Sequence, residues 1–208
     1  MYTHSKENLI NLDPQAALEL LKEGNERFIN NLRANRNYLQ QVNETRNGQY
    51  PFAVILSCMD SRTSAELIFD QGLGDIFSIR VAGNVLNEDI VGSMEYATKV
   101  VGSKIIVVLG HTKCGAIIGA CDGVELGQLS NLLNKVKPAI ERETSTQTER
   151  NGNNPEFVKN VTELNVQVTL QQIIERSPII AELAQEGEIK IVGGIYNVET
   201  GKVDFYED

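Results

Sequence analysis

Residues 52–62 read FAVILSCMDSR, an apolar run that ends in a thiol, a carboxylate and a guanidinium. The run 52–57 has strand length and almost no polar side chain, which is typical of a strand covered on both faces. Residues 104–109 (KIIVVL) repeat the pattern, and Gly-His-Thr-Lys-Cys follows at 110–114. Because ligands bind beyond the carboxyl ends of parallel strands, the two segments predict one sheet edge that carries both polar motifs.

Strands and helices alternate along the rest of the chain. Further strands are expected at 75–80, 189–196 and 202–206, the last two joined by a hairpin-like turn at Glu199-Thr200-Gly201. The sequence Thr63-Ser64-Ala65-Glu66 fits a capping box and predicts a helix that begins after Arg62. Helical spacing predicts other helices at 14–30, 89–101, 129–140, 156–176 and 178–185, and one that starts near 115. No element is assigned to the polar segment 33–50, and 141–154 is expected to be a loop.

This order of elements predicts an α/β fold. A mostly parallel central sheet is expected to be flanked by helices, with an antiparallel edge strand and an N-terminal helical arm. We interpret residues 1–208 as a single domain, with the arm at 1–48 and the α/β core at 49–208.

Composition restricts the partners and the compartment. The 208 residues carry a net charge of −9, which disfavours nucleic acid and anionic lipid as partners, since both require a basic surface. No apolar run approaches the roughly 20 residues that span a bilayer, and the N-terminus lacks the apolar region of a secretory signal. We therefore expect a cytoplasmic protein without membrane or nucleic-acid partners.

The three cysteines are too few and odd in number for a disulfide framework. Cys58 and Cys114 lie at the two predicted strand ends together with His111, and two thiolates and one imidazole suit zinc. Such a set leaves a fourth position, which Asp60 could occupy or guard. Each feature also has an ordinary explanation: a strand-end cysteine is usually a small apolar side chain, Asp60 and Arg62 could form a surface ion pair, and the thiols could be redox-active.

Two motifs resemble the signature of the β-class carbonic anhydrases. They are CMDSR at 58–62 and GHTKCG at 110–115, separated by about 50 residues, and the resemblance continues through GDIFSIRVAGNV and GSMEYATKVVGSKIIVVLGH between them. It covers roughly 49–121 well and the C-terminal strands more loosely. It implies one zinc ion per subunit, held by Cys58, His111 and Cys114, and reversible hydration of carbon dioxide to bicarbonate and a proton by attack of zinc-bound hydroxide.

The resemblance also implies a catalytic pair, Asp60 and Arg62. In the open form of the family's site, Arg62 would hold the Asp60 carboxylate away from the metal, whereas in a closed, inactive form Asp60 would be the fourth zinc ligand. Gln49 matches a position of the plant-like members, and the chain has no tryptophan, which the closed, bicarbonate-regulated members carry near their regulatory pocket. Both features favour the plant-like, open-site type.

By the same resemblance, five positions would bind substrate. Gln49 would donate its amide N–H to a bicarbonate oxygen, Phe77 and Tyr96 would wall the carbon dioxide pocket, and Ala82 and the Gly115 N–H would complete it. The family implies a homodimer, often paired into tetramers, in which the glutamine and the aromatic wall come from the neighbouring subunit. The helical segment from Pro14 to about Asn30 could pack on that subunit or on its own.

Other functions stay open at this stage. A relative with the same fold and metal could hydrolyse carbon disulfide or carbonyl sulfide, and a non-catalytic protein could use zinc for stability. The presence of Gln49, Asp60 and Arg62 argues against the non-catalytic alternative, since a structural site needs none of them. His4 is a weak candidate for a proton shuttle.

Overall fold

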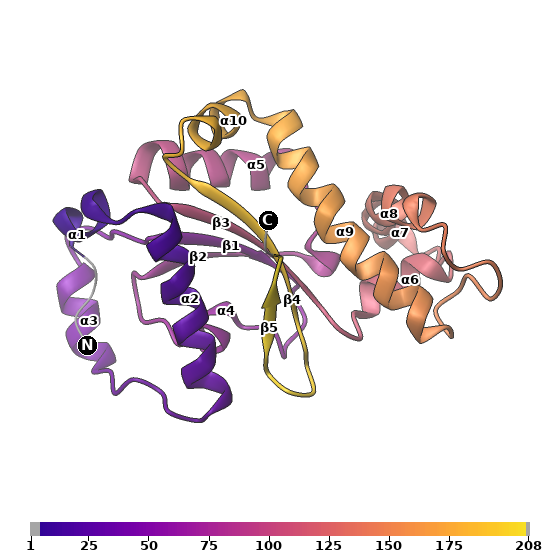
Figure 1. The fold of residues 1–208 in the computed structure, drawn as a ribbon, viewed down its shortest axis with the longest axis horizontal. Coiled ribbons are helices and arrows are strands. Elements are labelled where there is room, and N and C mark those ends of the chain that lie inside the picture. The colour runs from indigo at the N-terminus through magenta and orange to yellow at the C-terminus, as the bar shows by residue number, and fades with distance from the viewer. Residues whose placement is uncertain (1–4, 207–208) are drawn as a thin grey trace.

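The computed structural model describes residues 5–206, so His4 lies outside the described residues. Within this range one sheet has the strand order β2-β1-β3-β4-β5 (Figure 1). Strands β1 to β4 are parallel, and β5 pairs with β4 in the antiparallel sense. The predicted α/β class and its antiparallel edge strand are therefore confirmed. The strands are β1 Ala53–Ser57, β2 Ile76–Arg80, β3 Ile105–His111, β4 Lys190–Tyr196 and β5 Val203–Phe205.

The helices before and between the strands follow most of the sequence pattern. The helices are α1 Lys6–Asn11, α2 Pro14–Ile29, α3 Tyr38–Thr45, α4 Ala65–Ile68, α5 Glu88–Glu95, α6 Gly115–Cys121, α7 Gly127–Leu133, α8 Lys137–Arg142, α9 Pro155–Arg176 and α10 Pro178–Gln185. Short 3₁₀ turns lie at η1 Ala82–Asn84 and η3 Asn134–Val136, and the π-helical η2 Tyr96–Val101 continues α5. In residues 5–206, no helix combines the length and the apolar character needed to cross a membrane.

Three sequence expectations are corrected by these bounds. The single helix expected at 129–140 is two helices, α7 and α8, separated by the 3₁₀ turn η3. The unassigned polar segment contains α3. The capping box does not form: no side chain caps α4, and the Thr63 hydroxyl instead donates to the carbonyl oxygens of Cys58 and Asp60, at 2.9 Å each.

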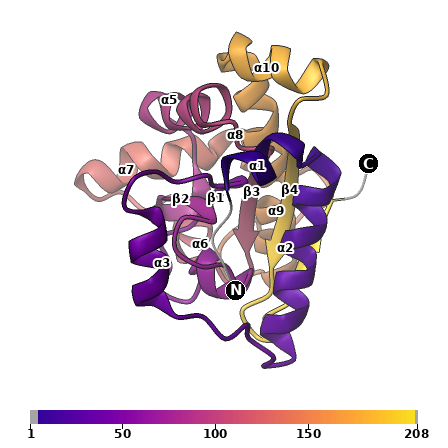
Figure 2. The same ribbon diagram turned by 90° about the vertical axis from the view of Figure 1, so that its left-hand side faces the viewer.

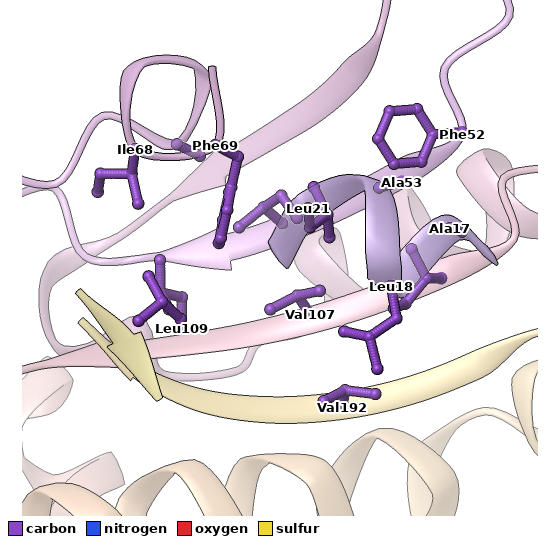
Figure 3. Packing of buried hydrophobic residues seen from close by; sticks show 14 of the residues in the cluster. Ala17, Leu18, Leu21, Phe52, Ala53, Ile68, Phe69, Val107, Leu109 and Val192 are labelled. Atoms are coloured by element: carbon purple, nitrogen blue, oxygen red, sulfur yellow. The ribbon is translucent and has the colours of Figure 1, made fainter. Parts of the chain in front are cut away.

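Each face of the sheet is covered by helices, which explains the continuous apolar runs. On one face, α2 packs Leu18 and Leu21 against β1 and β3 (Figure 3). On the other face, α5, α9 and α10 cover Leu56 and Val108 with Met94 and other apolar side chains. Successive side chains of β1 and β3 therefore enter different cores, and both strands are buried along their whole length.

Helix α9 packs directly on β3 and β4 at a point where each strand has a glycine. A Cβ atom at Gly110 of β3 would stand 2.7 Å from Val166 Cγ2, and one at Gly193 of β4 would stand 2.8 Å from Val166 Cγ1. Real Cβ atoms do not approach side chains so closely, and overpacking of this kind costs about 1–3 kcal/mol. The two glycines therefore set the height of α9 above the strands.

The N-terminal helices pack on the core of the same chain. Figure 2, in which the left-hand side of Figure 1 faces the viewer, shows α1, α2 and α3 toward the front of the molecule. Asp70, just after α4, accepts hydrogen bonds from Arg27 and Arg36 and from the backbone N–H of Ala34. Burial alone would raise the pKa of Asp70, but these donors outweigh it and hold the pKa below its ordinary value. The apolar stripe of α2 packs on the sheet of the same chain. The division of the single domain at residue 48 stays a prediction.

Candidate metal centre

Two adjacent parallel strands place three soft ligands at one sheet edge. Cys58 follows β1 directly, His111 is the last residue of β3, and Cys114 caps the start of α6. Their ligand atoms all lie within 4.8 Å of one another, and the two sulfur atoms are 3.9 Å apart. All three side chains are buried. The structure therefore brings together the three residues that the sequence motifs selected, in a spacing that one metal ion could bridge.

The imidazole of His111 is oriented for ligation through Nε2. Its Nδ1 lies 2.9 Å from the carbonyl oxygen of Thr112 and donates to it. Nε2 is buried and has no hydrogen-bond partner in the described part of the chain. A buried nitrogen without a partner is costly, and ligating histidines usually donate their other N–H in this way. The unpaired Nε2 beside two thiols thus fits a metal ion, and Thr112 supplies the acceptor that the sequence did not identify.

The thiol of Cys58 sits among hydrogen-bond donors. The backbone N–H groups of Asp60 and Gly83 each donate to its Sγ atom at 3.4 Å. The neighbouring Cys114 thiol lowers the pKa of Cys58 most, followed by the His111 ring and then by these N–H groups, and together they hold it far below its ordinary value in spite of burial. The pKa of Cys114 is raised by its contact with Cys58 and by burial. A ready thiolate at Cys58 suits metal binding, because the deprotonated sulfur is the ligand.

The carboxylate of Asp60 is held by Arg62 at both oxygen atoms. Arg62 Nε and the Arg62 backbone N–H donate to Oδ1 at 2.9 Å, and Nη2 donates to Oδ2 at 2.7 Å. These donors hold the pKa of Asp60 well below its usual range. Oδ2 also lies 4.0 Å from His111 Nε2. An ionised, fixed carboxylate therefore stands at the rim of the ligand cluster.

Two supporting residues were missed in the sequence. Arg80, at the end of β2, donates from Nε to the Cys58 carbonyl at 3.2 Å and from Nη2 to the Asp60 carbonyl at 2.6 Å. Thr63 donates to the same two carbonyls. The sequence places Arg80 at the end of a strand expected beside β1, and this position could have indicated its role. Thr63 was interpreted as part of a capping box, so its hydrogen bonds to the loop were not predicted. Together they fix the backbone loop that carries both Cys58 and Asp60.

The predicted substrate residues fall into two groups. Ala82 in η1 is next to Gly83, which contacts Cys58, and Gly115 follows Cys114. Phe77, by contrast, pairs in register with Val54, four residues before Cys58, roughly 13 Å back along the sheet at the usual strand rise. The first group lies near the metal ligands, and the Phe77 position does not.

Gln49 and Tyr96 join Phe77 in a region away from the metal ligands. The rings of Phe77 and Tyr96 are 6.2 Å apart between centroids and line a cavity of about 660 Å³. Tyr96 also lines a second cavity of about 400 Å³ with Gln49. No metal ligand lines either cavity. Within one chain, these three residues do not join the candidate ligand cluster.

Comparison with known proteins identifies the family. Residues 53–203 match the family model described as carbonic anhydrase. Carbonic anhydrase 2 of Mycobacterium tuberculosis is 37% identical over 195 residues, with 92% of each chain covered. A β-carbonic anhydrase of the fungus Aspergillus fumigatus superposes with a TM-score of 0.72 at 26% identity, over 93% of this chain and 90% of that one. A tetrameric β-carbonic anhydrase of Sordaria macrospora shares the fold at a TM-score of 0.68 and 23% identity, over 81% and 90% of the two chains. The chain belongs to the β-class carbonic anhydrases, lyases that hydrate carbon dioxide to bicarbonate.

Proposed function

We propose that the enzyme uses one zinc ion per subunit, held by Cys58 Sγ, His111 Nε2 and Cys114 Sγ. The observation that carries the proposal is the buried, unpaired Nε2 beside two thiols that lie 3.9 Å apart. Two sulfur atoms and one nitrogen form a donor set that zinc prefers, and they leave a fourth position for water or substrate. Zinc in such a site supplies Lewis acidity, which lowers the pKa of a bound water from about 15.7 toward roughly 7.

In this proposal Asp60 orients the attacking hydroxyl group. Its carboxylate accepts a hydrogen bond from that hydroxyl, so that an oxygen lone pair points at the carbon of carbon dioxide. Arg62 keeps Asp60 ionised and turns it away from direct ligation, because both carboxylate oxygens are already engaged. The proton released in the hydration passes to buffer. These contacts support the open-site type, in which Asp60 is not a ligand.

We propose further that a complete site contains residues of two subunits. Gln49, Phe77 and Tyr96 lie away from the ligands of their own chain, and exposed apolar side chains surround the Gln49 cavity. Ile10 is 64% exposed, Val100 71% and Tyr96 52%. Exposed apolar side chains that gather around a cavity are typical of protein–protein interfaces. In a homodimer, the aromatic wall of one subunit would hold the apolar substrate near the metal of the other, and Gln49 would donate to bicarbonate. Such dimers would pair into tetramers; the Sordaria macrospora enzyme is tetrameric.

A complementation experiment tests the two-subunit site. The variants Cys58→Ser and Gln49→Glu each disable a different half of the site, so each homodimer should be nearly inactive. After the two are unfolded together and refolded, roughly a quarter of wild-type activity should return, since half of random dimers are mixed and each holds one intact site. Cys58→Ser refolded with Asp60→Ala is the control and should recover nothing, because both changes lie in the same half. Equal recovery in the two mixtures would contradict the two-subunit site.

Stopped-flow hydration of carbon dioxide tests the zinc mechanism itself. The rate of the zinc-loaded enzyme should rise between about pH 6.5 and 9, the window in which a zinc-acidified water ionises. Two thiolates donate charge to the metal, so the midpoint should lie above neutrality. Asp60 adds nothing to this rise: its pKa is depressed, so the carboxylate is ionised at every pH above its usual range. Hydration that is absent or independent of pH across this window would contradict the mechanism.

We also propose a cytoplasmic location. All three cysteines are free, and the two in the cluster would be at risk of oxidation in an oxidising compartment. Fractionation of cells that produce the protein, followed by immunodetection, checks the location; recovery from an extracellular or periplasmic fraction would contradict it.

A further inference from the structure

Asn165 lies in the middle of α9, a helix that carries none of the metal ligands. Its side chain is 2% exposed. The amide nitrogen Nδ2 donates to the carbonyl oxygen of Gly83 at 2.9 Å, across 82 residues of sequence. An asparagine inside a helix usually weakens it, so a buried one with a long-range partner indicates a specific task.

Gly83 connects this hydrogen bond to the metal centre. Its backbone N–H donates to Cys58 Sγ at 3.4 Å, while its carbonyl accepts from Asn165. Gly83 and Asn84 both have positive φ, at 66° and 44°. The Gly83 N–H and the Gly83 carbonyl belong to two successive peptide units that meet at the Gly83 Cα atom. Because glycine has no side chain to restrict its φ and ψ angles, an anchor on the carbonyl restrains the turn and, with it, the neighbouring N–H.

The position of Asn165 is set by its neighbour in the helix. Val166 contacts the places where Cβ atoms of Gly110 and Gly193 would stand, so α9 rests directly on β3 and β4. Gly110 in turn immediately precedes His111. The close packing of α9 on the sheet thus places Val166 against β3, the strand that ends in His111, and places its neighbour Asn165 against the Gly83 turn.

We propose that Asn165 is a positioning residue for the metal centre. Through Gly83 it maintains the N–H···S hydrogen bond to Cys58, which holds the sulfur in the cluster and withdraws charge from the thiolate. The inference rests on the zinc site proposed above. Outer partners of this kind commonly change metal affinity by about 10- to 100-fold when they are removed. In this proposal Asn165 acts on the metal ligands through Gly83.

The test compares Asn165→Leu with Thr162→Val. Leucine has a similar volume but no donor. Thr162 lies one turn earlier, is also buried, and its hydroxyl donates only to Val158 of the same helix, so Thr162→Val is a matched control. Two quantities are measured: the thiolate-to-cobalt charge-transfer band of the Co²⁺-substituted protein, and the rate of zinc transfer to a chromogenic chelator.

Asn165→Leu should shift the charge-transfer band to longer wavelength, because a thiolate that loses a hydrogen bond is the stronger electron donor. It should also release zinc about 10- to 100-fold faster than wild type, whereas Thr162→Val should match wild type in both. If Asn165→Leu does not fold, Asn165→Ala removes the donor without adding bulk, and the same shifts are expected.

The outcomes separate this inference from the zinc site on which it rests. In one outcome, the wild-type protein shows the thiolate-to-cobalt band, and the Asn165 variants show the same band and the same rate of zinc release. That outcome would overturn the positioning role alone, even if the thermal stability of the variants fell. A wild-type protein without any thiolate-to-cobalt band would overturn the zinc site and the positioning role together.

Discussion

Cys58→Ser should lose its zinc on dialysis against a weak chelator, and carbon dioxide hydration should fall to the uncatalysed background. The hydroxyl of serine is a poor ligand for zinc, and the remaining pair of ligands is not enough to retain it. The loss of affinity should exceed the ~100-fold change that is typical when an outer partner of a metal site is removed. Zinc per subunit by mass spectrometry, together with stopped-flow hydration, measures both effects.

Cys121→Ser provides the control for this substitution. Cys121 is only partly buried, belongs to α6 and lies outside the ligand cluster, and burial raises the pKa of its thiol to about 11. This variant should keep its zinc and its activity. A Cys58→Ser protein that retained one zinc per subunit through dialysis would show that the cluster is not the metal site.

Asp60→Ala should keep its zinc but lose about 10²- to 10³-fold in kcat, the loss that is typical when one group that stabilises or orients the reacting oxygen is removed. Asp60 is not among the three ligands, and Cys58 retains its other contacts when the carboxylate is removed. Arg62 would lose its partner, but it is exposed enough for water to take over, so the fold should persist. Stopped-flow hydration at pH 8.5, with zinc content measured on the same sample, separates the two effects.

Asp204→Ala is the matched control, since Asp204 forms an exposed ion pair with Lys202 on the edge strand β5. Its activity should equal that of wild type. Full activity in zinc-loaded Asp60→Ala would mean that the hydroxyl is oriented by another group, and the role proposed for the Asp60–Arg62 pair would be wrong.

The sheet could be predicted well because its signals are local. Strands β1 and β3 are covered by helices on both faces, so their residues are apolar without alternation, and this pattern is readable in the sequence. Helix α3, in contrast, was not predicted from the sequence. Its only buried residue is Gln41, which accepts from the Leu73 backbone, while Leu39 and Val42 face outward. The segment 33–50 is polar, so no apolar stripe facing the core marked α3 in the sequence.

The residues of the candidate site also fall into those that the sequence indicated and those that it did not. The three ligands and the Asp60–Arg62 pair were found because they form short motifs at strand ends. Arg80 and Asn165 were not singled out, because they act on atoms that lie about 20 to 80 residues away in the sequence. A residue that binds a backbone carbonyl leaves no pattern around itself, and only the fold shows which carbonyl it binds.

Gly110 and Gly193 have a consequence for how the protein can vary. Neither has a side chain, and neither is a ligand, yet a single methyl group at either would push α9 outward. Such a displacement would carry Asn165 away from the Gly83 turn. A substitution in the core would therefore lower the affinity of the site for the metal. A side chain at either position would therefore weaken the metal site as well as the packing of the core. A survey that mapped essential residues by their distance from the metal alone would overlook them.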